Sequence, residues 1–216
     1  HEKNKCAISN FAATLKACTG KYIAILEGDD YWTDPLKLQK QVGFLENNPE
    51  YVITYSDRQA FDFNGYIKHD IGGAIRDVES IELKKGVDIS TLTACFRNVL
   101  AEFPPEFECA RIGDVFVWSL LGHFGKGKYL GDIKPASYRI HEGGIFSKKT
   151  EQKRLIMQQI TYGTLYAYYN KIDNKELADY FLERNLVASI KVFGLRSLFK
   201  ILLKKLFFIN SVKIKK

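Results

Sequence analysis

Apolar residues near the start of the chain recur at intervals of three and four, and a short continuous apolar run follows them. The recurring residues predict a helix over residues 6–18, and they are Ile8, Phe11, Ala12 and Leu15. Gly20 stands where a helix commonly ends. The apolar run is residues 21–26, KYIAIL. Its length and composition predict a buried strand of a parallel sheet.

A second helix and a second strand follow in the same order. The helical spacing is carried by Leu36, Leu38, Val42 and Leu45. Thr33 or Asp34 is expected to cap this helix, with Pro35 at its first position. Residues 51–56, YVITYS, are strong β-formers and predict a strand. Helix, strand, helix and strand in succession indicate an α/β fold.

The remainder divides into a less regular middle and a helical end. Residues 57–90 contain four glycines and predict a hairpin or a loop excursion. Periodicity then predicts a strand at 91–97, an apolar helix at 115–124, short strands at 129–130 and 136–140, and helices at 150–170, 175–193 and 195–209.

The composition is that of a folded protein whose charge is unevenly distributed. Hydrophobic residues make up 46% of the 216 residues, which suits one sizeable domain with or without a small appendage. The net charge is +7, yet residues 191–216 hold eight Lys or Arg and no Asp or Glu, so the rest is close to neutral. A nucleic-acid-binding protein more often spreads basic residues over its folded face, which argues against that class. The four cysteines form no CxxC pair and are typical of thiols in a reducing cytoplasm.

Three carboxylates cluster directly after the first predicted strand, in Glu27-Gly28-Asp29-Asp30. Ligands of α/β sheets bind beyond the carboxyl ends of the strands. Like charges this close together call for a cation, and a divalent metal ion that holds phosphates meets that need. A solvated turn that caps the next helix explains the same residues, so this pattern alone leaves both interpretations open.

The residues around the cluster favour the metal site over the helix-capping turn. Residues 20–32 (GKYIAILEGDDYW), followed by Asp34-Pro35, Lys37-Leu38, Gln41 and Phe44-Leu45, strongly resemble the family 2 glycosyltransferases of the GT-A fold. The resemblance covers about residues 5–147. It implies a Rossmann-like mixed sheet flanked by helices.

The resemblance also implies how the chain is organised. Residues 1–149 correspond to the catalytic core, and residues 150–216 form a C-terminal helical region. In the family, further strands that grip the nucleotide precede the matching part. We therefore expect the fold to be incomplete at its N-terminus, by an extension on the order of 70 residues, and the fragment alone to be weakly active or inactive.

In this family the end of the strand is a DxD-type motif that binds the metal ion and the donor diphosphate. The resemblance therefore implies Asp29 as the main ligand of Mn²⁺ or Mg²⁺, with Glu27 and Asp30 as donor or metal contacts. Glu27 differs from the usual first Asp of the motif but keeps its charge. Upstream, Asn10 matches a donor-binding position, whereas Ser9 stands where the family often has Arg.

A candidate general base lies farther along the chain, at Asp114. Inverting glycosyl transfer needs a group that takes the proton of the acceptor hydroxyl. A carboxylate at the start of a helix is kept ionised by the helix dipole and by backbone N–H groups. On spacing alone a simple helix cap explains Asp114 better. Family 2 enzymes carry an Asp or Glu base before an apolar helix, and the resemblance assigns that role to Asp114.

Six further residues receive roles from the resemblance or from their chemistry. Trp32 and Tyr31 are predicted to stack on the sugar or base of the donor. Residues 138–141, YRIH, resemble a stretch that closes many family 2 catalytic domains. This likeness implies that Arg139 supports the donor phosphates and that His141 contacts the metal ion or the diphosphate. Thr93 and Arg97 correspond to positions near the acceptor pocket.

The C-terminal segment is basic and amphipathic. Arg196, Lys200 and Lys204 recur every four residues and share one helical face, while apolar residues cover much of the rest. Such a segment suits the headgroup region of an anionic membrane. A helix that packs on the body or on a second subunit explains the same pattern.

Together these features predict an inverting, metal-dependent glycosyltransferase of bacterial surface polysaccharide synthesis. It would use a nucleotide-sugar donor, with UDP favoured, and a glycan or lipid-linked acceptor. We expect it in the cytoplasm, at the inner face of the cell membrane. The alternative is a non-catalytic or degenerate sugar- or nucleotide-binding scaffold of the same fold.

Overall fold

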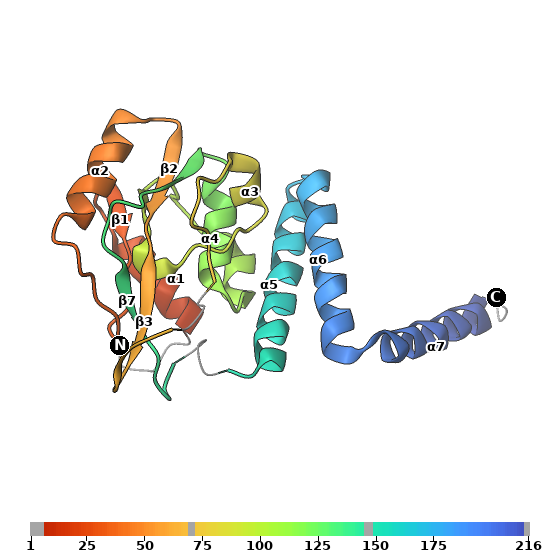
Figure 1. The fold of residues 1–216 in the computed structure, drawn as a ribbon. Helices are drawn as coiled ribbons and strands as arrows, with labels where there is room; N and C mark the ends of the chain where they lie inside the picture. The colour runs from red at the N-terminus through yellow and green to blue at the C-terminus, as the bar shows by residue number, and fades with distance from the viewer. Residues whose placement is uncertain (1–6, 69–71, 145–148, 214–216) are drawn as a thin grey trace.

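Two mixed β-sheets form the frame of the molecule (Figure 1). The computed structural model describes residues 7–68, 72–144 and 149–213, with side chains as far as Lys204. The larger sheet has the order β1 (Tyr22–Ala24), β5 (Cys95–Arg97), β2 (Tyr51–Tyr55) and β6 (Lys126–Tyr129). The smaller sheet has the order β4 (Gly65–Ile67), β3 (Arg58–Asp62) and β7 (Ala136–Arg139). The β2–β6 and β3–β7 pairs are parallel, and the other pairs are antiparallel.

Helices surround these sheets and confirm the predicted α/β class. They are α1 (Ala7–Ala17), α2 (Lys37–Asn47), α3 (Ser80–Lys84), α4 (Gly113–Leu121), α5 (Glu151–Lys171), α6 (Lys175–Phe193) and α7 (Leu195–Lys213). Two 3-10 turns, η1 (Thr91–Thr93) and η2 (Pro105–Cys109), complete the described elements. In Figure 1, α5 and α6 stand side by side next to α4, and α7 extends away from them toward the C-terminus.

A buried polar contact ties α2 to the larger sheet. Lys37 and Gln41 lie one helical turn apart and are both buried. The Lys37 ammonium donates to the Gln41 side-chain oxygen at 2.6 Å, and both side chains donate to the carbonyl oxygen of Thr93. Burial lowers the pKa of Lys37 to about 8. These bonds fix the first turns of α2 against the backbone that precedes β5.

The core is centred on α4, which is buried on nearly all sides. Six consecutive residues, from 116 to 121, are buried, as expected for a helix that is apolar all round. Trp118 is fully buried, donates to the carbonyl oxygen of Ile89 at 3.1 Å and packs edge-on against Phe96. Trp118 is therefore a core residue, as its apolar surroundings in the sequence indicate.

The C-terminal helices α5 and α6 share this core. Tyr169 on α5 and Phe181 on α6 are fully buried and stack with ring centroids 5.6 Å apart. The Tyr169 hydroxyl meets the hydroxyl of Ser119 on α4 at 2.8 Å. One continuous hydrophobic cluster thus spans the division expected at residue 149.

The orientation predicted for β1 is wrong within the described residues. The strand was expected in a parallel sheet, but it pairs antiparallel with β5, with Tyr22 opposite Arg97 and Ala24 opposite Cys95. Only Ile23 of the three β1 residues is buried. An apolar run predicts that a strand forms, but its direction is fixed by a partner more than 70 residues away in the chain.

Several predicted boundaries also change. The strand expected over 91–97 begins with the 3-10 turn η1, and only Cys95–Arg97 is extended. The helix expected from Pro35 begins at Lys37, because the Asp34 carboxylate accepts the N–H groups of Leu36 and Lys134 in a tight turn. The strand expected at 129–130 lies at Lys126–Tyr129. The hairpin expected within 57–90 is confirmed as β3–β4, and the short helix α3 follows it.

Candidate functional site

The carboxylates predicted to bind the donor lie in a turn after β1. The Asp30 N–H donates to the Glu27 carbonyl oxygen at 3.2 Å, which closes the turn around Gly28 and Asp29. Directly after it, Tyr31 forms an antiparallel bridge with Ser137 of β7. This bridge brings the turn to the end of the smaller sheet, so residues from two distant parts of the chain meet there.

The end of β7 supplies the partners of the acidic turn. His141 Nε2 lies 2.7 Å from Asp29 Oδ2. The Arg139 side chain donates through Nε to the Asp29 carbonyl oxygen at 2.8 Å, and the Arg139 backbone N–H donates to Asp30 Oδ1 at 2.7 Å. The structure therefore brings together four of the residues singled out in the sequence: Asp29, Asp30, Arg139 and His141.

The electrostatics of the turn reflect crowding of like charges. The side chain of Glu27 is exposed overall, yet the protein atoms around its carboxyl group desolvate it. This desolvation, with the carboxylates of Asp30, Asp114 and Asp29, raises the pKa of Glu27 to about 7. Desolvation and the neighbouring Asp29 likewise raise the pKa of Asp30 to about 6, against the opposing hydrogen bond from Arg139.

Asp114 lies in the first turn of α4, and its charge acts on Glu27 of the acidic turn. Its Oδ2 accepts the hydroxyl of Thr91 at 2.7 Å, and its Oδ1 accepts the N–H of Val115 at 2.8 Å. Burial raises the pKa of Asp114, although both hydrogen bonds oppose the rise. The helix start alone suggested a carboxylate kept readily ionised, whereas burial makes Asp114 a more basic group.

Thr91 and Asp88, which lie beside Asp114, and Arg58, which lies near Asp88, were missed by sequence reasoning. Thr91 holds the carboxylate directly. The pKa of Asp88 is raised, chiefly by burial and next by the charge of Asp114, while the nearby Arg58 lowers it. No local pattern marks these residues, because Thr91 is 23 positions from its partner and Arg58 comes from β3.

Trp32 and Asn10 lie in different surroundings. Trp32 is half-buried, donates through Nε1 to the carbonyl oxygen of Leu92 at 2.7 Å, and has the Lys37 ammonium 4.4 Å from its ring. It also lines a shallow surface pocket with Pro35 and Leu38. Asn10 is exposed on α1, and no hydrogen bond joins it to the acidic turn among the described residues. The donor contacts predicted for both residues stay predictions.

Thr93 and Arg97 are engaged in the fold. Thr93 is buried, and its hydroxyl donates to the carbonyl oxygen of Ser90 at 2.8 Å. Arg97 donates to the carbonyl oxygens of Tyr51, Leu45 and Asn48 and lies opposite Tyr22, at the end of β1 remote from the acidic turn. These contacts brace β5 against α2 and β2. The acceptor contacts predicted for Thr93 and Arg97 gain no support from them and stay predictions.

The carboxylate and imidazole at the turn fit a divalent ion that two protein side chains, Asp29 and His141, would hold. Within the described ranges, no three His, Cys, Asp or Glu side chains converge as metal ligands, so Glu27 does not complete a three-ligand site with Asp29 and His141. The Asp29 carboxylate and the His141 imidazole do meet. Ions of the Mg²⁺ type are commonly held by one or two protein carboxylates, with substrate phosphates completing the coordination. The crowded carboxylates around this pair favour a cation.

Comparison with known proteins identifies a protein family whose model matches half of the chain. The family model described as glycosyl transferase family 2 matches residues 1–109. This range holds the acidic turn and ends before Asp114, Arg139 and His141.

Individual relatives match over smaller portions. Uncharacterized proteins of Mycobacterium bovis and of two Mycobacterium tuberculosis strains are 53% identical to the chain over 47 residues, which is 22% of this chain and 14% of theirs. The crystal structure of residues 1–349 of TarS from S. aureus aligns with 83% of this chain and 51% of that one, at 13% identity and a TM-score of 0.46. The chain thus matches a small part of the curated relatives and about half of the solved structure.

Proposed function

The chain belongs to glycosyltransferase family 2, and on this basis we propose that it transfers a sugar from a nucleotide-diphosphate sugar to a glycan or lipid-linked acceptor, with inversion of the anomeric configuration. UDP-sugars are the favoured donors, and bacterial surface polysaccharide synthesis is the proposed setting. The observation that carries the proposal is the Asp29–His141 contact beside Glu27, whose pKa is raised by desolvation and by the carboxylates of Asp30, Asp114 and Asp29. This observation supports the proposal that one cluster supplies both ligands for the donor diphosphate and a base for the acceptor.

The donor end of the reaction is assigned to the acidic turn. Asp29 and His141 would hold a divalent ion, Mn²⁺ or Mg²⁺, which when bound neutralises the charge that develops on the leaving diphosphate. Arg139 adds a fixed positive charge beside the turn, since its backbone and side chain bond Asp30 and Asp29. Glu27 and Asp30 are proposed to contact the donor or the ion.

The acceptor end is assigned to Asp114. Its carboxylate accepts the proton of the acceptor hydroxyl while the hydroxyl oxygen bonds to the anomeric carbon. The bond from that carbon to the phosphate oxygen breaks, and its electron pair leaves with the nucleoside diphosphate. Burial strengthens Asp114 as a proton acceptor, and Thr91 together with the Val115 N–H fixes its orientation.

A donor screen on the full-length protein tests this function. UDP-glucose, UDP-galactose and UDP-N-acetylglucosamine are incubated with the protein and Mn²⁺, and release of UDP is followed with and without an acceptor extract. We expect release from at least one donor and its loss in EDTA. Binding of a donor without any turnover would support the non-catalytic scaffold instead.

We further propose that α7 attaches the enzyme to an anionic membrane surface. None of the helices in the described part of the chain is long and apolar enough to cross a bilayer. Leu195, Phe199 and Leu202 on α7 are exposed, as are Arg196, Lys200 and Lys204. A helix that presents both an apolar and a basic face suits the headgroup region, and a lipid-linked acceptor would be found there.

Charge reversal on α7 tests the attachment. The variant Arg196→Glu/Lys200→Glu/Lys204→Glu is expected to bind phosphatidylglycerol vesicles about a hundredfold or more weakly than wild type, because each basic residue near such a surface contributes about 1 kcal/mol. The matched control reverses Lys16, Lys153 and Lys175, which are exposed elsewhere. Vesicle co-sedimentation that is equal in all three proteins would exclude α7 as the anchor. Self-association without vesicle binding would assign it to a subunit interface.

A further inference from the structure

A set of aromatic rings on the smaller sheet adjoins the acidic turn. We call Tyr31, Phe61, Phe63 and Tyr66 the aromatic platform. Phe61 lies at its centre, with ring centroids 5.0 Å from Tyr31 and 6.3 Å from Tyr66, both in edge-on contact. Phe61 is itself buried, whereas Tyr31 is 40% exposed and Tyr66 58% exposed. Phe63, in the turn of the β3–β4 hairpin, is 94% exposed.

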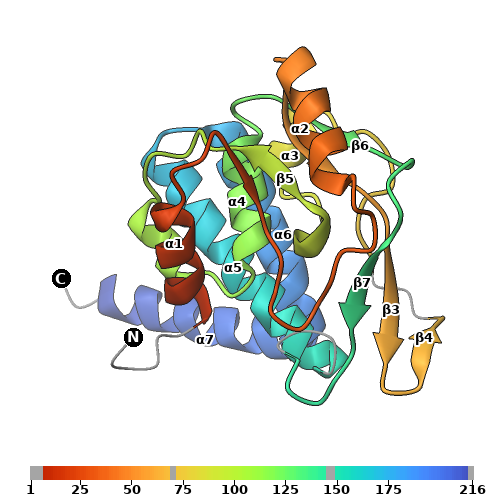
Figure 2. The ribbon, with the colours of Figure 1, turned by 90° about the vertical axis from the view of Figure 1, so that its left-hand side faces the viewer.

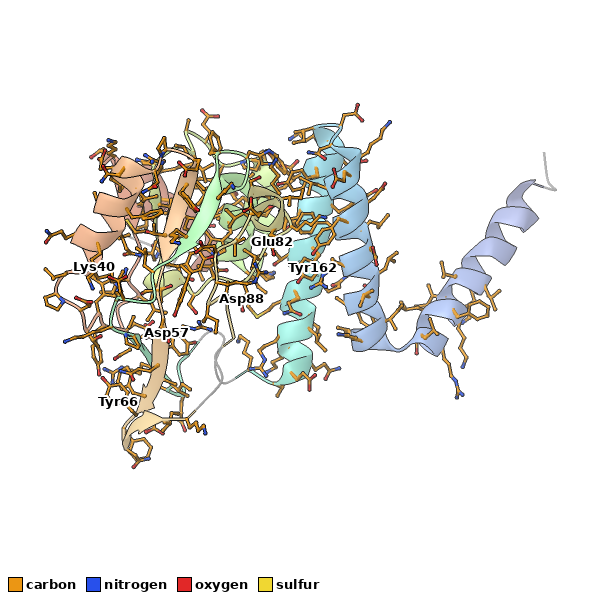
Figure 3. All side chains as sticks on the ribbon, turned by 45° about the horizontal axis from the view of Figure 1, so that its top comes forward. Lys40, Asp57, Tyr66, Glu82, Asp88 and Tyr162 are labelled. Atoms are coloured by element: carbon orange, nitrogen blue, oxygen red, sulfur yellow. The ribbon has the colours of Figure 1, made fainter. Side chains whose placement is uncertain are left out.

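The place of Tyr66 on this hairpin can be followed in Figure 3, where it lies at the outer end of the smaller sheet. Figure 2 shows the same hairpin at the margin of the molecule, on the side opposite α1. Because the Phe63 side chain is almost fully exposed, it contributes little hydrophobic stabilisation to the fold. Exposed apolar groups that gather in one place and carry a polar rim mark binding surfaces.

The polar groups of the aromatic platform are already ordered. The Tyr31 and Tyr66 hydroxyls lie 3.3 Å apart, and the Tyr66 hydroxyl lies 3.1 Å from Ser137 Oγ. These hydrogen bonds, with one from Gln59, lower the pKa of Tyr66. The rings of Tyr31 and Tyr66 are therefore held in place without a ligand, which reduces the entropy lost on binding.

The aromatic platform is continuous with the proposed donor site. Tyr31 follows Asp30 directly in the chain. The Arg139 guanidinium lies 4.6 Å from the centre of the Phe61 ring, while its Nε donates to the Asp29 carbonyl oxygen. Strand register places Phe61 opposite both Tyr66 and Arg139. A chain lying on the rings would thus lead toward the acidic turn.

We propose that the aromatic platform binds the sugar rings of a glycan acceptor, an inference that rests on the proposed glycosyl transfer. Pyranose rings present C–H faces that pack on aromatic rings, and hydroxyls at their edges that pair with polar side chains. The aromatic platform offers both, because Tyr31, Tyr66, Gln59 and Arg139 place hydrogen-bonding groups around its rings. An apolar peptide would pack on the ring faces but would offer few groups to the tyrosine hydroxyls at their edges.

The test compares binding of soluble hexasaccharides of glucose, N-acetylglucosamine and mannose to the full-length protein by calorimetry. The variants are Phe63→Ala, Tyr66→Phe and the double variant Phe63→Ala/Tyr66→Ala. Phe124→Ala, which removes an exposed ring elsewhere, is the matched control. We expect at least one hexasaccharide to bind wild type and the control equally. The double variant should bind it about tenfold more weakly, because each lost stack contributes a factor of a few.

Donor hydrolysis by the same variants separates this inference from the proposed function. Manganese-dependent release of UDP should stay within about twofold of wild type in all of them. If the double variant binds the hexasaccharide more weakly but wild type hydrolyses no donor, the transferase function is refuted. The proposal that the aromatic platform binds a glycan is then still supported. Three results would overturn the proposal that the aromatic platform binds the acceptor. They are equal hexasaccharide binding by wild type and the double variant, an equal loss of binding in Phe124→Ala, and no binding by wild type.

Discussion

Asp114→Asn is expected to lower kcat by about 10²–10⁴-fold, the usual contribution of a positioned general base. The amide has nearly the shape of the carboxylate, and its oxygen can still accept the Thr91 hydroxyl that now bonds Asp114 at 2.7 Å. It has no basic site for the proton of the acceptor hydroxyl. Because Asp114 acts on the acceptor, affinity for the donor should remain close to that of wild type.

Steady-state kinetics with the donor found in the screen, together with calorimetric donor binding, measure both quantities. Asp179→Asn, the same change at an exposed position on α6, serves as the control and should behave as wild type. An Asp114→Asn protein that keeps kcat within about twofold of wild type would remove Asp114 from the reaction. A parallel loss of donor affinity would assign Asp114 to the donor site instead.

Asp29→Asn is expected to reduce kcat/KM by about 10²-fold or more and to abolish activation by Mn²⁺. A divalent ion contributes several kcal/mol of charge stabilisation in the transition state, and each 1.36 kcal/mol corresponds to about tenfold in rate. Asp29 is the one carboxylate of the turn that contacts His141, so its neutralisation removes one of the two proposed protein ligands.

The dependence of rate on Mn²⁺ concentration, measured for wild type, Asp29→Asn and Asp179→Asn, checks this prediction. Wild type and Asp179→Asn should show the same saturable activation. If Asp29→Asn retained that activation with an unchanged midpoint, Asp29 would not hold the ion, and Glu27 or Asp30 would be the next candidate ligand.

Much of the fold follows from local patterns in the sequence. The apolar spacing predicts α1, α5 and α6 nearly to their ends, since each must bury one face against the same core. The sequence does not predict how strands pair. The parallel setting expected for β1 failed because its partner β5 lies about 70 residues away, and no local pattern encodes strand direction.

The candidate site could be predicted only through the family resemblance. Spacing alone left the acidic turn equally explained as a helix cap, yet Asp29 and His141 meet across 112 positions of the chain. Thr91 was overlooked because a hydroxyl in an apolar segment looks like an ordinary strand residue. The guanidinium of Arg97 binds backbone carbonyl oxygens at the end of β1 remote from the acidic turn, so its predicted place near the acceptor gains no support and stays a prediction.

Whether the acidic turn holds the donor is tested by calorimetric titration of UDP into the full-length protein with Mn²⁺ and with EDTA, repeated for Asp29→Asn. If the acidic turn and His141 hold the donor diphosphate through a divalent ion, UDP binds wild type tightly only with Mn²⁺, and the variant loses that gain. UDP affinity that is the same in EDTA, or that Asp29→Asn leaves unchanged, would show that Asp29 and a divalent ion do not hold the donor diphosphate.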